Sequence, residues 1–257
     1  MKKIQHIGTV VFNKKVCPRF FHLGVTAPGW ASKVRPGQFI HIRIADGLKP
    51  FFRRPFSVFR TRNNKVEILY EVVGPGTELL AGKKKGDKLD LLGPLGNSFD
   101  MPAKNIRQVV MIAGGVGLAP FLALSDRLKT KKLERILLYG ARTAGHVPSL
   151  KEFRLNGCQV HIATNDGSRG KKGLVSVLYP HINLDPATTM IYTCGPRPMM
   201  ADVQLVAARY GLPAQASCEE VMACGLGTCL GCVIKTTRGY RTVCNDGPVF
   251  DLREIIF

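Results

Sequence analysis

The sequence lacks a hydrophobic run long enough to cross a membrane. Its longest uncharged apolar stretch, residues 109–124, is shorter than the roughly 20 residues that a spanning helix needs, and it contains three glycines and Pro120. A secretory signal is also missing, because the apolar stretch after the basic start is broken by His6 and Asn13. We therefore expect a cytoplasmic protein with no membrane attachment, whose thiols are reduced or bound to metal.

Acidic residues are scarce: 18 Asp and Glu face 37 Lys and Arg, which gives a formal net charge of +19. Such a charge can serve phosphate binding in nucleic-acid-binding proteins. Here the basic residues are scattered in short runs, such as residues 83–85 and 131–132, and no helix-turn-helix, RNA-binding or zinc-finger pattern accompanies them. We interpret the charge as a solvated surface that favours anionic cofactors and an acidic partner, and we expect no nucleic-acid binding.

Histidine is absent after residue 181, whereas cysteines gather near the C-terminus at Cys224, Cys229, Cys232 and Cys244. The spacing C-x4-C-x2-C with a distant fourth cysteine is the plant-type ferredoxin arrangement, which ligates a [2Fe–2S] cluster through four thiolates. A structural zinc site is the alternative, but there is only one C-x2-C pair and no nearby histidine. A disulfide framework fits less well, because such frameworks belong to small secreted chains.

The residues around these cysteines suit a tight loop closed by a hairpin. Glycine can adopt a positive φ and lets backbone N–H groups approach cluster sulfurs, and we expect this of Gly225, Gly227 and Gly231. Residues 233–237 and 240–243 read as two strands joined by a turn at residues 238–239. That hairpin would return the fourth cysteine beside the loop.

The pattern of apolar residues divides the chain into three predicted domains. Residues 1–101 contain short β-type runs between turn signals, which predict an antiparallel β-barrel. Residues 102–212 alternate continuous apolar strands with helices, which predicts a parallel α/β sheet covered on both faces. Residues 213–257 form the small cysteine-containing domain. We find no internal repeats, and the fold class is α/β plus all-β.

Two segments of the first domain have residue types that suit a phosphate-containing ligand. Residues 54–57, Arg-Pro-Phe-Ser, sit where a loop enters a strand and could offer a guanidinium, an aromatic face and a hydroxyl. Residues 74–77 precede a short helix, for which Thr77 is the predicted N-cap. Either segment, taken alone, could equally be an ordinary strand start or turn.

Two further segments of the second domain follow strands. Gly114, Gly115 and Gly117 come after an apolar strand, in a loop that opens a helix at Pro120, and such a loop lets backbone N–H groups meet a pyrophosphate. The loop departs from the G-x-G-x-x-G fingerprint because proline holds the third glycine's place. The segment Cys194-Gly195-Pro196 follows the last predicted parallel strand, at the edge where α/β sheets bind ligands.

The ordered set of these segments resembles the ferredoxin–NADP reductase superfamily. With residues 218–232 and 244–250 added, the chain is similar to the electron-transfer subunits of NAD-dependent dihydroorotate dehydrogenase. The resemblance implies FAD contacts from nine residues: Arg54, Pro55, Phe56, Ser57, Leu69, Tyr70, Glu71, Gly76 and Thr77. It implies that Gly114, Gly115, Gly117, Cys194, Gly195 and Pro196 hold NAD(H) as co-substrate, and that the four C-terminal cysteines bind the cluster.

The resemblance also implies a function in pyrimidine biosynthesis. A partner subunit carrying FMN would oxidise dihydroorotate, and electrons would pass through the [2Fe–2S] cluster and FAD to NAD⁺, in an assembly of two copies of each chain. The flavin is needed because the cluster handles one electron and nicotinamide accepts two. No segment resembles an orotate site, so the isolated chain is expected not to oxidise dihydroorotate.

Two other functions stay open from sequence. One is the small subunit of an NADH-dependent ferredoxin–NADP reductase or sulfide dehydrogenase, although an Asp ligand to the cluster would favour that reductase and four cysteines favour the dihydroorotate enzyme. The other, a zinc-containing nucleic-acid-binding protein, predicts salt-sensitive binding to DNA or RNA and no flavin absorbance.

Overall fold

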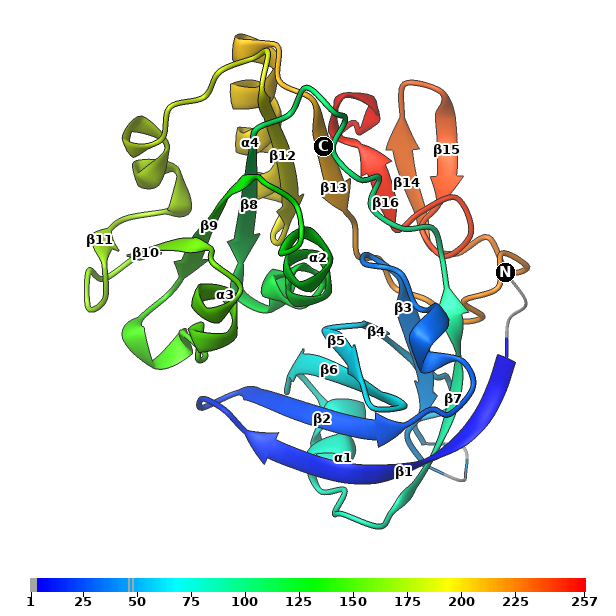
Figure 1. Ribbon diagram of the computed structural model, residues 1–257. Coiled ribbons are helices and arrows are strands. Elements are labelled where there is room, and N and C mark those ends of the chain that lie inside the picture. The colour runs from blue at the N-terminus through cyan, green and yellow to red at the C-terminus, as the bar shows by residue number, and fades with distance from the viewer. Residues whose placement is uncertain (1–3, 46, 48) are drawn as a thin grey trace.

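The computed structural model describes residues 4–45, 47 and 49–257, and its strands form two large sheets and a C-terminal hairpin (Figure 1). The first sheet is antiparallel and curls into a half-barrel. Its order is β4-β3-β7-β1-β2-β6-β5, with α1 (Pro75–Ala81) between β6 and β7. The strands are β1 (Ile4–Lys15), β2 (Phe20–Thr26), β3 (Phe39–Arg43), β4 (Arg54–Ser57), β5 (Arg60–Arg62), β6 (Lys65–Glu71) and β7 (Lys88–Leu95).

Alternation of side chains along these strands separates two faces of the half-barrel. Ile40 and Ile42 of β3 point inward and are buried with the barrel core around Leu23, Ile68 and Leu91. Phe39, on the opposite face of β3, joins the core of the second sheet instead. The outer face of β3 is therefore covered by the rest of the molecule.

The second sheet has the order β11-β10-β9-β8-β12-β13-β16, and its pairs are parallel except β13 with β16. Residues of α2 and α3 pack on one face, and residues of α4 pack on the other. The predicted fold class, with a parallel sheet covered on both faces, is confirmed. The elements are β8 (Gln108–Gly114), α2 (Phe121–Leu128), β9 (Glu134–Ala141), α3 (Lys151–Leu155), β10 (Gln159–Thr164), β11 (Lys171–Lys172), β12 (Thr189–Cys194), α4 (Arg197–Tyr210), β13 (Ala214–Ser217) and β16 (Val249–Asp251).

The C-terminal segment forms the hairpin of β14 (Val233–Thr236) and β15 (Gly239–Thr242). Its turn lies at residues 237–238, one residue earlier than predicted, because Thr236 pairs with Gly239, whose φ is +93°. The same segment contributes β16 to the second sheet. The boundaries predicted after residues 101 and 212 stay predictions.

The C-terminal segment also contacts the half-barrel. The side chain of Asn97, after β7, donates to the carbonyls of Asp246 (2.9 Å) and Val249 (2.7 Å) and accepts from the Val249 N–H. Five short 3-10 helices among the described residues complete the connections: Ala31–Lys33, Gly115–Leu118, Ala144–His146, Val175–His181 and Leu252–Glu254. The cysteine segment is thus held by both sheets.

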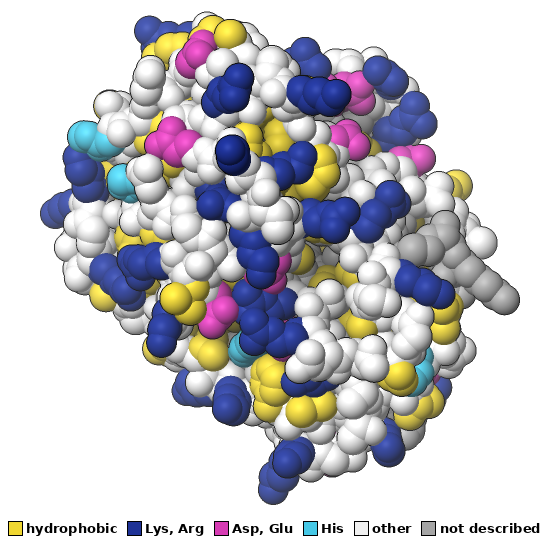
Figure 2. Space-filling view, viewed as in Figure 1, with side chains coloured by type: hydrophobic (Ala, Val, Ile, Leu, Met, Phe, Trp, Pro, Cys, Tyr) yellow, Lys and Arg dark blue, Asp and Glu magenta, His cyan; other side chains and the backbone are white. Residues whose placement is uncertain are grey.

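Lys and Arg side chains spread over the visible face of the molecule in Figure 2, with acidic side chains between them. This distribution agrees with a solvated basic surface rather than a single stripe. Among the helices of the described residues, none is long and apolar enough to span a membrane.

Candidate functional site

The glycine loop after β8 packs backbone against backbone on the segment that follows β12. A Cβ on Gly117 would lie 2.2 Å from the Cys194 carbonyl oxygen, and one on Gly114 would lie 2.8 Å from Pro196 and from the Met199 sulfur. A side chain at either position would force the two loops apart. Gly115, at φ +56°, has nothing within 4 Å of its Cβ position, so its backbone borders open space. The six predicted nucleotide-site residues thus come together at the carboxyl ends of β8 and β12.

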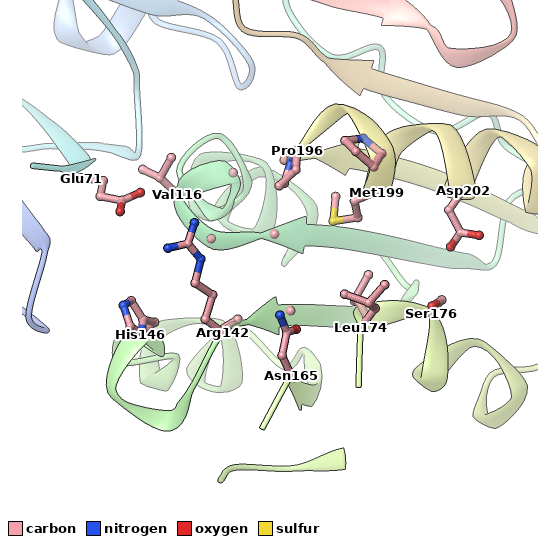
Figure 3. A pocket seen from close by; sticks show the side chains of 18 of the residues that line it. Glu71, Val116, Arg142, His146, Asn165, Leu174, Ser176, Pro196, Met199 and Asp202 are labelled. Carbon is pink, nitrogen blue, oxygen red and sulfur yellow. The ribbon is translucent and has the colours of Figure 1, made fainter. Parts of the chain in front are cut away.

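A cavity of about 620 Å³ opens in front of these loops (Figure 3). Arg142, directly after β9, extends toward the side of the cavity where Glu71 and Val116 lie. Asn165 after β10 and Leu174 line the wall below, and Met199 lines the opposite wall. The cavity lies where ligands enter parallel α/β sheets, at the carboxyl edge, and its size suits a nucleotide.

A second cavity, of about 590 Å³, borders the half-barrel. Eight of the nine predicted flavin-site residues line it: Arg54, Pro55, Phe56, Ser57, Leu69, Tyr70, Glu71 and Thr77. The remaining residue, Gly76, lies behind Arg54, because a Cβ on it would be 3.2 Å from the arginine Nε. A guanidinium held at the rim of an apolar cavity suits a phosphate or pyrophosphate group.

The local structure of Thr77 differs from the prediction. Helix α1 begins at Pro75 with Gly74 as its N-cap, so Thr77 is not the N-cap but the third helical residue. Its hydroxyl accepts hydrogen bonds from the N–H groups of Val73 (2.9 Å) and Gly74 (3.1 Å). Proline fixes φ and needs no N–H partner at the first helical position, which explains the earlier start.

Tyr70 and Phe56 also belong to the wall of the half-barrel. Their rings meet edge to face with centroids 5.7 Å apart, and the Tyr70 hydroxyl donates to Asn13 at 3.1 Å. Burial raises the pKa of Tyr70 to about 12, so its hydroxyl stays protonated. These two side chains shape the cavity floor and bring no charge to it.

The two cavities share three lining residues: Glu71, Val116 and Glu219. Glu71 also pairs with Arg19, with Oε1 3.3 Å from Nε. Glu219 is open to the cavities but otherwise surrounded by protein, and this burial raises the pKa of its carboxyl, with the charge of Glu71 raising it further. A ligand in one cavity would therefore lie beside a ligand in the other, with a carboxyl group between them.

The four C-terminal cysteines lie in two neighbouring pairs. The Cys229 N–H points at the Cys224 sulfur (3.5 Å), and the Cys244 N–H points at the Cys232 sulfur (3.4 Å), as the predicted hairpin requires. Within the described residues, no three His, Cys, Asp or Glu side chains gather as a single-ion site. Two thiol pairs suit a two-iron cluster, in which each iron takes two protein sulfurs, better than one tetrahedral zinc.

The surroundings of the sulfurs suit a cluster. Burial opposes a thiolate at Cys224, but hydrogen bonds from the Leu226 N–H, Thr228 and Cys229 outweigh it and lower the pKa to about 5. Burial and the neighbouring Cys232 raise the pKa of Cys244 to about 12. The two shifts have opposite directions, so the backbone N–H groups favour the thiolate at Cys224, whereas Cys244 is protonated unless a bound metal replaces its proton.

The loop conformation follows the prediction at two of three glycines. Gly225 and Gly227 have φ values of +67° and +86°. Gly231 does not have a positive φ; Leu230 does, at +55°, and its side chain is 63 % exposed. The left-handed residue lies one position earlier than predicted, on a side chain for which this region is strained.

Several residues that line the cavities were not predicted from the sequence. Arg142 could have been found, because it follows a parallel strand at the carboxyl edge. Glu219 and Pro248 flank the cysteine segment, and no local pattern shows that they turn toward the flavin-side cavity.

Comparisons with known proteins agree with this geometry. The iron–sulfur cluster binding domain of dihydroorotate dehydrogenase B matches residues 219–256, and an oxidoreductase NAD-binding domain matches residues 111–205. The electron transfer subunit of dihydroorotate dehydrogenase B (NAD(+)) from Desulforamulus reducens is 35% identical over 94% of each chain. That of Caldanaerobacter subterraneus subsp. tengcongensis is 36% identical over 96% of this chain and 97% of its own.

The chain belongs to this family of electron transfer subunits. It is accordingly an oxidoreductase subunit with FAD- and NAD-binding folds and an iron–sulfur domain. The structure of an NADH-dependent reduced ferredoxin-NADP oxidoreductase is also similar, at 29% identity and a TM-score of 0.85 over 97% of this chain and 89% of that one. A ferredoxin NADP+ reductase from Neisseria gonorrhoeae with bound FAD and NADP shares the fold, at 20% identity and a TM-score of 0.69 over 80% of this chain and 92% of that one.

Proposed function

We propose that this chain passes electrons from an FMN-containing dihydroorotate dehydrogenase subunit, through a [2Fe–2S] cluster and FAD, to NAD⁺ in pyrimidine biosynthesis. The observation that carries the proposal is the contiguity of the three sites. The nucleotide and flavin-side cavities share Glu71, Val116 and Glu219. Val221 and Met222, just before the first cluster cysteine, line the flavin-side cavity.

The proposed roles follow from this placement. Cys224, Cys229, Cys232 and Cys244 would hold the cluster through their thiolates, and backbone N–H groups donate to the sulfurs of Cys224 and Cys232. The flavin residues, from Arg54 to Thr77, would bind FAD with its phosphates at the arginine and its ring toward Ser57 and Glu219. The close-packed glycine loop and Cys194-Gly195-Pro196 would place the nicotinamide in the adjoining cavity. The bound groups supply the redox chemistry, in which FAD joins one-electron and two-electron carriers.

The nucleotide is proposed to be NAD(H). The cavity contains Arg142, and the exposed loop after β10 adds basic residues, which could also serve a 2′-phosphate. Family membership favours NAD. A lower KM for NADPH than for NADH in a flavin-reduction assay would overturn this assignment.

The surface around the cluster loop is proposed to bind the catalytic subunit, in an assembly of two copies of each chain. Cys229 is exposed, the next residue, Leu230, exposes 63 % of its surface, and Val221, which precedes the cluster loop, exposes 88 %. Electrons from a partner must enter near the cluster, so an apolar surface at this place suits that partner. We also propose a cytoplasmic location, where thiols are kept from forming disulfides.

The test is reconstitution with an FMN-containing dihydroorotate dehydrogenase catalytic subunit. The purified pair should reduce NAD⁺ when given dihydroorotate, and the single chain should oxidise NADH with an artificial acceptor but leave dihydroorotate unchanged. Turnover of dihydroorotate by the single chain would contradict the proposal that the catalytic subunit, and not this chain, oxidises dihydroorotate. The similarity to the ferredoxin-NADP oxidoreductase supports a second candidate, and assembly with a large two-flavin subunit instead would favour it.

A further inference from the structure

His41 is a fully buried histidine whose ring has no hydrogen-bond partner. Its exposed fraction is 0 %, and neither Nδ1 nor Nε2 bonds to any described residue. A buried polar group left without a partner destabilises the folded state, so such a group is expected to serve something that the protein alone does not supply. The position of the ring indicates what that is.

The His41 ring lies against the cluster loop. A Cβ on Gly225, the residue directly after Cys224, would be 2.6 Å from the ring Cε1, 2.8 Å from Nδ1 and 2.9 Å from Nε2. Glycine is therefore required there by the imidazole as well as by its φ of +67°. The backbone that positions the first cluster cysteine rests on this ring.

The other side of His41 faces the flavin-binding strands. Its neighbour on the outer face of β3, Phe39, lines the flavin-side cavity, and the two rings are 5.7 Å apart between centroids. In the register of β3 with β4, His41 pairs with Pro55 and Phe39 pairs with Ser57, both of which line the same cavity. His41 thus lies between the cluster loop and the flavin-binding strands.

The imidazole is neutral at physiological pH. Burial lowers the pKa of His41 to about 4, and the charge of Arg53 lowers it further. A neutral imidazole carries one N–H donor and one acceptor nitrogen. An N–H donor beside an iron–sulfur cluster stabilises the reduced, more negative state and raises the reduction potential.

We propose that His41 is a positioning and tuning residue for the cluster, seating the Cys224 loop and donating a ring hydrogen bond to the cluster's sulfur shell. The inference rests on the proposed cluster site. It assigns a function to a barrel residue far from the cysteines in sequence, and it explains why Gly225 cannot carry a side chain.

The test compares His41→Phe, which keeps an aromatic ring but removes the donor, with His41→Gln, which keeps a donor. His22→Phe is the matched control, because His22 is a half-buried histidine of β2, which is separated from β3 by β7 and β1 in the sheet, and it bonds to Glu67. The full chain is reconstituted anaerobically. Iron and sulfide content, the electron paramagnetic resonance spectrum of the reduced cluster and separate midpoint potentials of cluster and flavin are measured.

We expect His41→Phe to bind iron but to lower the cluster potential alone. At the wild-type midpoint, the ratio of reduced to oxidised cluster should fall about three- to tenfold, where tenfold corresponds to about 59 mV for one electron. His41→Gln should recover part of this shift, and His22→Phe should show none. If the iron-loaded His41→Phe chain has the wild-type cluster potential and electron paramagnetic resonance spectrum, His41 only packs against the loop and the proposal is wrong. Loss of iron from both His41 variants would also contradict the proposed hydrogen bond from His41 to the cluster. A wild-type chain that binds no iron would instead refute the proposed cluster site.

Discussion

Substitution of a single cysteine tests the proposed ligands of the iron–sulfur cluster. In Cys229→Ser, the hydroxyl is a much poorer iron ligand than a thiolate, so we expect at least a several-fold loss of bound iron and of the visible cluster absorbance, with FAD retained. Iron and labile sulfide analysis of anaerobically purified protein measures this. Cys17→Ser is the control, because Cys17 is a half-buried cysteine outside the loop. Equal iron in both variants would remove Cys229 from the ligand set.

Gly117 tests whether the two loops at the nucleotide cavity must touch. In Gly117→Ala, the new methyl group would lie 2.2 Å from the Cys194 carbonyl oxygen, so the loops must separate. Overpacking of this kind costs about 1–3 kcal/mol, and we expect the KM for NADH to rise about tenfold or more while FAD stays bound. Steady-state NADH oxidation measures the effect. Gly82→Ala, whose Cβ would lie 3.5 Å from its nearest neighbour, should leave KM unchanged.

Site residues that belong to a local sequence pattern could be predicted from the sequence. Residues that reach the cavities only through the tertiary fold could not. The spacing of the cysteines and the order of the glycine segments predicted residues that the fold brings together around the two cavities and in the cysteine loop. Leu230 has the positive φ that the glycine pattern predicted for Gly231, so glycine positions alone do not locate the left-handed residues of this loop. Glu219 reaches both cavities from a segment without any local signal.

Among the elements, the strands with continuous apolar runs were predicted best. The continuous apolar strands predicted between residues 102 and 212 include β8 and β9, because strands buried on both faces of a parallel sheet need such runs. In strand β2 the apolar pattern is interrupted by His22 and Gly24. Gly24 is required because the Phe12 ring of β1 lies over it, 2.4 Å from its Cβ position. Strands β13 and β16 are short and depend on pairing across 32 or more residues.

Strand β5 is joined to helices α2 and α3 by one buried arginine. Arg60, 6 % exposed, donates to Asp126 through Nε (2.6 Å) and Nη2 (2.8 Å) and to Glu152 through Nη1 (2.7 Å). In Arg60→Met we expect a loss of about 3 kcal/mol in the free energy of unfolding, because two carboxylates lose their partner. Flavin reduction by NADH should also slow, since the half-barrel and the nucleotide sheet lose this link. Arg62→Met, exposed on the same strand, is the control for denaturation and stopped-flow measurements.

The same contact predicts a pH dependence. Burial opposes the charge of Asp126, but hydrogen bonds from Arg60 and Asn156 outweigh it and hold the pKa below its usual value of about 3.9. A carboxyl whose pKa is lowered by folding stabilises the protein above the unfolded pKa, and this contribution is lost as pH falls through the folded pKa. The stability difference between wild type and Asp126→Asn should therefore be constant near pH 7 and shrink below about pH 4. A difference that grows on acidification, measured by urea unfolding, would contradict this assignment.

At the scale of the whole molecule, the half-barrel, the nucleotide sheet and the cysteine segment meet at one place. The flavin-side cavity takes residues from all three, including Ser57, Ala119 and Met222. None of the three could complete this cavity alone, so folding of the chain and formation of the redox site are coupled. Sequence motifs identified each part, but only the packing of β3 against the cysteine segment shows that the parts adjoin.

The exposed cluster loop leads to a final prediction about assembly. Leu230 is 63 % exposed in the loop, and aspartate tolerates its φ of +55° better than most residues do, so Leu230→Asp should fold and bind iron. A charge placed in an apolar interface should weaken binding of the catalytic subunit at least tenfold, or about 1.4 kcal/mol. Leu205→Asp, at a position of α4 that is 70 % exposed, is the matched control. We expect only the loop variant to lose dihydroorotate-dependent NAD⁺ reduction while both keep NADH oxidation with an artificial acceptor. Equal affinity of the two variants for the catalytic subunit, measured by calorimetry, would place the interface elsewhere on the molecule.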